Sequence, residues 1–93
     1  MLVIVEAPTH NILISLGYKL VEDAWENSGR RTYSHDDDVS RTEMANLKIN
    51  LGSAGWIRDT NALWIFRQQE SGEILEVEPG GAETSGHFLH HLK

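Results

Sequence analysis

The chain has 93 residues, with 14 acidic and 8 basic side chains and a formal net charge of −6. This length allows one small domain over residues 1–93, and a hydrophobic content of 40% is enough to fill its single core. The net charge argues against a surface that tracks nucleic-acid phosphates, and the lack of cysteine excludes disulfides and thiolate chemistry. Because no apolar run approaches a membrane span of about 18 residues, we expect a soluble, cytoplasmic protein.

The N-terminal residues predict a strand followed by a short helix. Residues 2–5 are all apolar and suit a short strand or an extended arm packed on the core. Further on, Ile12, Leu13 and Leu16 fall on one helical face, and Gly17 suits the left-handed conformation that commonly ends a helix. We therefore expect a two-turn helix that lies across a sheet.

A hairpin and an acidic loop are predicted next. Residues 18–25 and 30–35 lie on either side of an Asn-Ser-Gly sequence, which is typical of a turn between two strands. Asp36, Asp37 and Asp38 follow as a loop, since like charges in a row repel one another and stay in water. If residues 30–35 form an outer strand, its unpaired backbone groups would permit a homodimer by edge-strand pairing.

The second half of the chain predicts the rest of the sheet. Residues 47–51 alternate apolar and polar side chains with the period of a strand. The apolar run at 62–66 contains two large aromatic rings and predicts a buried central strand, and residues 74–78 predict the strand after it. Residues 86–93 predict a last helical turn. The fold expected is α+β: a small antiparallel β-meander of about five or six strands, with one short N-terminal helix packed on it and a short C-terminal helical turn.

Acidic residues dominate the last quarter of the chain and predict a protein-binding surface. From Gln68 onward there are five glutamates and one lysine. Since no catalytic or cofactor motif is present, we expect a non-enzymatic domain that binds a protein partner with a basic surface. The same charge pattern is also typical of a face that only keeps a small protein soluble. The candidate partner-binding residues are Glu70, Glu73, Glu76, Glu78, Asp36, Asp37 and Asp38.

A compact acidic domain is also similar in form to inhibitors encoded by phages or mobile elements. Anti-CRISPR proteins are an example, because some of them block basic nucleic-acid channels with carboxylates. This similarity is one of size and charge, with no shared motif, and it implies an inhibitory role.

A metal site is the first alternative. On a helix, His87 and His91 would lie one turn apart and could bind the same zinc ion, with His35 or the run of aspartates as a further ligand. The chain would then be a metal-binding protein or a metal-dependent hydrolase with zinc as its cofactor. The competing interpretation packs Phe88 and Leu92 on the core and leaves the histidines in water.

Nucleic-acid or nucleotide binding is the second alternative. Trp25, Arg30, Arg31 and Tyr33 combine cations with aromatic rings, a composition that can grip a phosphate or stack on a base. Two successive arginines on a strand point to opposite faces, however, and pairing with nearby acidic residues accounts for them equally well. The net negative charge disfavours a nucleic-acid partner.

Overall fold

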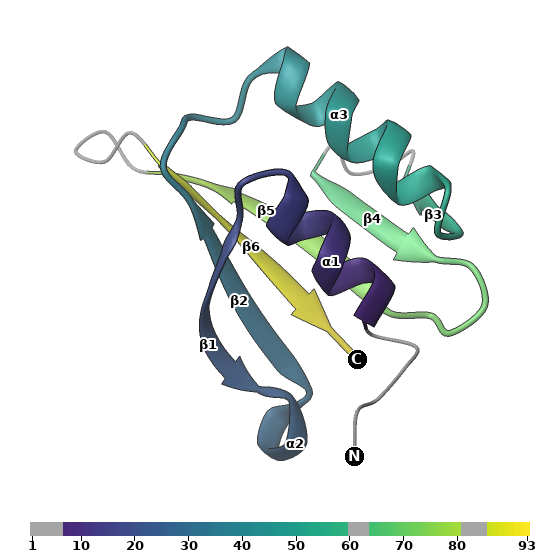
Figure 1. The fold of residues 1–93 in the computed structure, drawn as a ribbon. Helices are drawn as coiled ribbons and strands as arrows, with labels where there is room; N and C mark the ends of the chain where they lie inside the picture. The colour runs from purple at the N-terminus through teal and green to yellow at the C-terminus, as the bar shows by residue number, and fades with distance from the viewer. Residues whose placement is uncertain (1–6, 60–63, 81–85) are drawn as a thin grey trace.

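The computed structural model of the chain describes residues 7–59, 64–80 and 86–93 (Figure 1). The predicted α+β fold is confirmed, with six antiparallel strands and an N-terminal helix packed on the sheet. Residues 2–5, the first predicted strand, lie outside the described residues. The helices are α1 (Ala7–Ser15), α2 (Trp25–Ser28) and α3 (Arg41–Gly52), and the strands are β1 (Lys19–Ala24), β2 (Arg30–His35), β3 (Trp56–Arg58), β4 (Ile65–Gln68), β5 (Ile74–Pro79) and β6 (His87–Leu92).

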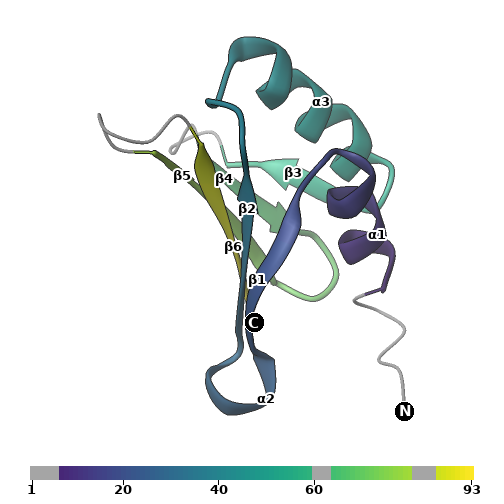
Figure 2. The same ribbon diagram turned by 60° about the vertical axis from the view of Figure 1, so that its left-hand side comes forward.

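The sheet has the strand order β1-β2-β6-β5-β4-β3. Strands β3 to β6 form an antiparallel meander, and the hairpin of β1 and β2 extends the sheet on the far side of β6. Helices α1 and α3 lie on the same face of the sheet, as Figure 2 shows. The opposite face, called the open face below, is covered by no helix of the described part of the chain.

Two glycines end the first helix and the hairpin turn as expected. Gly17, after α1, has a φ of 95°, and the N–H of Tyr18 donates to the carbonyl of Leu13. Gly29, after the single turn α2, has a φ of 71°. Both are conformations that an L side chain rarely adopts, so these positions favour glycine.

The strand predicted at residues 47–51 is wrong, because these residues belong to α3. Leu47 and Leu51 are one turn apart and buried, whereas Ile49 between them is 71% exposed. The side chain of Ser40 accepts a hydrogen bond from the backbone N–H of Glu43, which is the N-terminal cap of a helix. A strand would align Leu47, Ile49 and Leu51 on one face, whereas the helix buries Leu47 and Leu51 and turns Ile49 to solvent.

The helical turn predicted at residues 86–93 is also wrong. Residues 87–92 form β6, which is hydrogen-bonded to β2 on one side and to β5 on the other. As a strand, the segment buries His87, Leu89 and His91 on the helix side and leaves Phe88 43% exposed on the open face. The interpretation that packs Phe88 on the core and leaves the histidines in water is therefore reversed.

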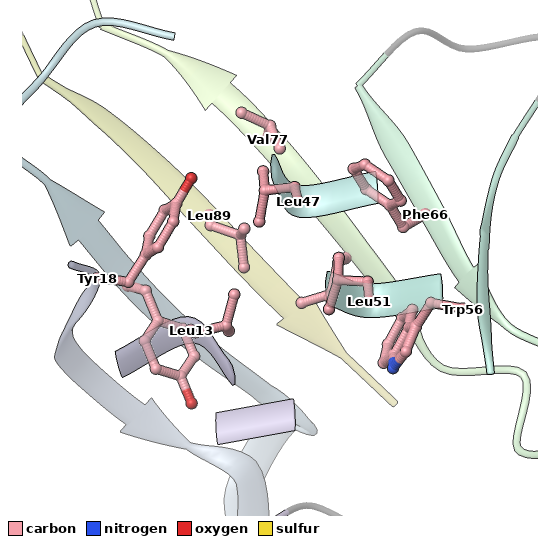
Figure 3. Close-up of a cluster of buried hydrophobic side chains, with 10 residues drawn as sticks. Leu13, Tyr18, Leu47, Leu51, Trp56, Phe66, Val77 and Leu89 are labelled. Carbon is pink, nitrogen blue, oxygen red and sulfur yellow. The ribbon is translucent and has the colours of Figure 1, made fainter. Parts of the chain in front are cut away.

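The core lies between the sheet and the helices α1 and α3 (Figure 3). Of the apolar run at 62–66, residues 62 and 63 lie outside the described residues. Phe66 is buried, but β4 is second from the edge of the sheet and is not a central strand. The fully or nearly buried hydrophobic residues of this core are Leu13, Tyr18, Tyr33, Leu47, Leu51, Trp56, Phe66, Leu75, Val77 and Leu89.

Among the strands of the described residues, the outer ones are β1 and β3, and the expectation that residues 30–35 form an outer strand is wrong. Strand β2 pairs with β1 and with β6, which leaves it no free edge for a dimer. Strand β1 has a register shift between Leu20 and Glu22 and carries Lys19, Glu22 and Asp23, features that discourage pairing with another sheet. Among the described helices, none is long and apolar enough to cross a membrane.

Candidate protein-binding surface

The strand register assigns the predicted acidic residues to two different faces. On β5, Leu75 and Val77 are buried under the helices, so Glu76 and Glu78 point to the open face. Glu76 is paired across the sheet with His90, and Glu78 with Phe88. Glu76 is exposed, and the side chain of Glu78 is 60% exposed.

The aspartate loop lies at the same end of the sheet as Glu78. His35, the last residue of β2, is paired with His87, which in turn is paired with Pro79 at the end of β5. Asp36, Asp37 and Asp38 are exposed and lead from this point to α3. We call Asp36, Asp37, Asp38, Glu76, Glu78 and Phe88 together the acidic surface.

The acidic surface combines negative charge with one exposed aromatic ring. Phe88 lies on the open face beside Glu78, with Ser34 on its other side. Cations lie on the open face too. Arg30 is beside His90, the register partner of Glu76. Arg67 pairs with Ile74, two residues from Glu76. At the loop end of the sheet, Nζ of Lys19 lies 3.3 Å from a carboxylate oxygen of Asp36. The side chains of Lys19 and Asp36 are largely exposed, so this ion pair contributes little and leaves the charge of Asp36 accessible.

A hydrogen-bonded group on the open face fixes the position of Glu78. A terminal guanidinium nitrogen of Arg30 lies 3.1 Å from Nδ1 of His90, and Oε1 of Glu78 lies 2.6 Å from Nε2 of the same ring. Arginine can only donate, so Nδ1 accepts and the ring carries its proton on Nε2, which donates to Glu78. Thr32 also lies within hydrogen-bond distance of Nδ1, at 3.2 Å. The 7% exposed His90 thus holds a carboxylate at the edge of the acidic surface.

Glu70 and Glu73 are not part of this surface. Glu73 points to the helix side, where its Oε1 lies 2.7 Å from Nε2 of His91. The ring of His91 lies 4.5 Å from that of Trp25 and 5.8 Å from that of Trp56. Glu70 and Glu73 line a separate cavity of about 240 Å³, together with Pro8, Thr9, Ala54, Gln68 and Ser71.

The histidines predicted to bind a metal do not converge. His35 and His87 stack with 5.2 Å between ring centroids, but His91 lies four residues further along β6, roughly 13 Å away at about 3.3 Å per residue. Both ring nitrogens of His35 and of His87 are engaged in hydrogen bonds to other groups. Within the described ranges, no group of three or more His, Asp or Glu side chains could hold a metal ion.

The residues proposed for nucleic-acid binding are divided between the core and the two faces. Trp25 and Tyr33 are buried. Arg31 lies over the Trp25 ring at 4.8 Å and pairs with Asp23 at 3.1 Å, whereas Arg30 is on the open face with His90. They present no shared platform on which a base could stack.

A buried polar group behind the aspartate loop was not predicted. The hydroxyl of Tyr18 lies 2.9 Å from Oε1 of Glu43 and 2.7 Å from Nε2 of His87. Burial raises the pKa of the Tyr18 phenol well above its usual range, and the charge and hydrogen bond of Glu43 raise it further. No sequence motif marks this group, because its members come from three distant segments.

Phe88 was also missed as an exposed residue, and His90 as a buried one. Their alternation with His87, Leu89 and His91 is visible in the sequence, but it becomes informative only once the segment is known to be a strand.

The site and the fold define a small α+β domain with one sheet face covered by helices and one left open. No protein-family model, curated protein or solved structure matches the chain.

Proposed function

We propose that the chain is a non-enzymatic protein-binding domain that recognises a partner with a basic surface through the acidic surface. The observation that carries this proposal is the register that pairs Glu78 with the exposed Phe88, at the end of the sheet where the aspartate loop begins, with Glu76 two residues away on the same face. Five of the seven predicted partner-binding residues belong to this surface.

The chemistry of the surface suits a lysine- or arginine-rich partner. Carboxylates steer a basic partner toward the site and make like-charged proteins poor competitors. An aromatic side chain that becomes fully buried on binding supplies affinity, and charged groups around it act mainly on the rate and specificity of association. Phe88 has the position of such an anchor, with carboxylates beside it and Leu92 further along the same strand face.

An inhibitory role is one form of this function. A partner whose basic surface normally binds nucleic acid would lose access to it when the acidic surface occupies the same cations. Size, net charge and the clustering of carboxylates support this form of the proposal, which includes inhibitors of the anti-CRISPR type encoded by phages or mobile elements.

The test is a comparison of two double variants with the wild-type chain. Glu76→Lys with Phe88→Ser changes the acidic surface. Glu26→Lys with Ile49→Ser is the control, because it also reverses one carboxylate charge and replaces one exposed hydrophobic side chain by serine, at positions on α2 and α3. Proteins captured from a lysate by the wild-type chain are identified, and the affinity of the purified partner is then measured for all three chains.

We expect the first variant to weaken binding by about tenfold or more, because it removes the aromatic anchor and reverses a charge on the same sheet face. The control variant should bind as the wild type does, and the wild-type affinity should fall with added salt. A partner that binds both variants equally well would rule out the acidic surface as the binding site.

A further inference from the structure

The loop that carries three of the acidic residues is held from behind by two histidine rings. Asp37 donates its backbone N–H to Nδ1 of His35, at 3.1 Å, and its carbonyl oxygen lies 2.7 Å from Nδ1 of His87. The two rings stack with an interplanar angle of 17°. Both backbone groups of Asp37 therefore depend on where protons lie on these two rings.

The hydrogen bonds of His35 require a neutral ring. Its Nδ1 accepts from Asp37, so its proton is on Nε2, which donates to the carbonyl of Leu16 at 3.1 Å. A second proton on Nδ1 would place two donors against each other. It would also release the N–H of Asp37.

The hydrogen bonds of His87 require an additional proton in its surroundings. Nδ1 must carry a hydrogen, because a carbonyl oxygen can only accept. On the other side, Tyr18 lies between Nε2 of His87 and the carboxylate of Glu43 and has a single hydroxyl hydrogen to donate. With a neutral His87 and an ionised Glu43, one of these two contacts would bring two acceptors together at less than 3 Å.

One extra proton resolves this conflict in either of two positions. If His87 is doubly protonated, Nε2 donates to the Tyr18 oxygen and Tyr18 donates to Glu43. If Glu43 is protonated instead, it donates to Tyr18, and Tyr18 donates to His87. In both cases the chain from Glu43 through Tyr18 to His87 holds one proton more than a free carboxylate and a neutral imidazole would.

We propose that protonation regulates the acidic surface. The aspartate loop is held in place only while the Glu43–Tyr18–His87 chain keeps its extra proton and His35 has none. Order in the loop, and with it the binding of a basic partner, is therefore greatest at an intermediate pH and falls on both the acid and the alkaline side. The effect on binding rests on the function proposed above.

The other ionisable groups around His87 support this division of protons. A charged His87 disfavours a second charge on the stacked ring of His35, and the aspartate loop favours a positive charge behind it. From β5, Pro79 faces His87 and adds no charge, while Glu78 points to the open face and is bonded to His90. Among the described residues, Tyr18 before β1 and His35 on β2 contact the His87 ring. The backbone carbonyl of Asp37 in the loop is bonded to Nδ1 of His87, and Glu43 on α3 is bonded to Tyr18.

The proton count is tested by NMR on the free protein between about pH 5 and about pH 9, a range that includes the ordinary titration of histidine. At about pH 7, ring nitrogen and carboxyl carbon shifts should report a doubly protonated His87 or a protonated Glu43, and a neutral His35. The amide signals of Asp36, Asp37 and Asp38 should change at both ends of the range. A neutral His87 together with an ionised Glu43 would overturn the inference.

Glu43→Gln isolates the alkaline step. A glutamine amide at this position can donate to the Tyr18 oxygen while Tyr18 donates to a neutral His87, so no extra proton is needed. In this variant we expect the amide signals of the aspartate loop to stay constant on the alkaline side and still to change on the acid side. Glu73→Gln is the matched control, because it removes a carboxylate bonded to a different buried histidine, and its loop profile should equal that of the wild type.

If the amide signals of Asp36, Asp37 and Asp38 depend on pH in the same way in the wild type and in Glu43→Gln, the inference is overturned. The two proposals fail separately, since these signals are read without a partner, whereas the acidic surface is tested by Glu76→Lys with Phe88→Ser. For an identified partner, the affinity of the wild type should vary with pH as the amide signals of the aspartate loop do. Glu43→Gln should remove the fall in affinity at alkaline pH. An affinity independent of pH would reject the regulatory role.

Discussion

The hydroxyl oxygen of Tyr18 lies 2.9 Å from Oε1 of Glu43, which joins the segment before β1 to the first turns of α3. Tyr18 is 2% exposed. Burial raises the pKa of its phenol, and the neighbouring carboxylate adds to the effect by charge repulsion and by accepting the phenolic hydrogen. The folded chain therefore keeps this proton at a pH where an exposed tyrosine ionises.

We expect the free energy of unfolding to fall as the pH rises above about 10, the ordinary pKa of tyrosine. In that range the unfolded chain releases the Tyr18 proton and the folded chain does not. The stabilisation is complete below that pH and is lost as the pH rises, by up to about 1.4 kcal/mol per pH unit. Denaturant unfolding at several alkaline pH values measures this slope. A Tyr18→Phe variant should have a smaller slope, and an unchanged one would contradict the assignment to Tyr18.

Leu47 and Ile49 distinguish the helix α3 from the strand that the sequence pattern suggests. Leu47→Ala should lower the free energy of unfolding by about 2 to 5 kcal/mol, because it leaves a cavity in the core. Ile49→Ala should change it by no more than about 0.5 kcal/mol, because the side chain is largely exposed and alanine favours a helix. A strand would place both side chains on one face, so equal losses in urea unfolding would contradict the helix.

The elements predicted from the sequence are those with a local signal. Gly17 and Gly29 mark a helix end and a turn, and their conformations depend on a few neighbouring residues. Leu47, Ile49 and Leu51 alternate with the period of a strand, but Leu47 and Leu51 are also one helical turn apart, so five residues cannot decide between helix and strand. Ser40 and Glu43 carry the deciding signal, a helix cap that lies before the alternating segment.

The error at β6 has a different cause. The sequence His-Phe-Leu-His-His-Leu buries three imidazoles only because distant groups are available to bond them, such as Tyr18 for His87 and Glu73 for His91. Nothing local to residues 87–92 reveals those partners. The same limit applies to the candidate site: the acidic residues were predicted, but the separation of Glu73 from Glu76 follows from which side of β5 faces the helices.

Excess zinc is expected to leave the melting temperature of an untagged chain unchanged. His35 and His87 would have to break their hydrogen bonds to bind a metal, and His91 is too distant to join them. An ion bound only by the folded state would add about 2.7 kcal/mol of stability at a concentration one hundred times its Kd. A rise in melting temperature that His87→Gln with His91→Gln abolishes would restore the metal site.

Gly86→Ala should destabilise the fold at the start of β6. A Cβ at this position would lie 2.5 Å from the carbonyl oxygen of His35 and 3.6 Å from the Cα of Asp36. These are backbone atoms at the end of β2, so they cannot move aside as the tip of a flexible side chain can. We expect a loss of about 1 to 3 kcal/mol in urea unfolding, with shifted amide signals in the aspartate loop.

Gly52→Ala is the matched control for this substitution. Gly52 is the last residue of α3, and a Cβ there would have no atom within 4 Å. Alanine stabilises a helix relative to glycine, so stability should stay the same or rise by up to about 1 kcal/mol. Because both variants add one methyl group, a difference between them isolates the close approach of Gly86 to β2. Equal effects would mean that the start of β6 lies further from His35 than the 2.5 Å contact requires.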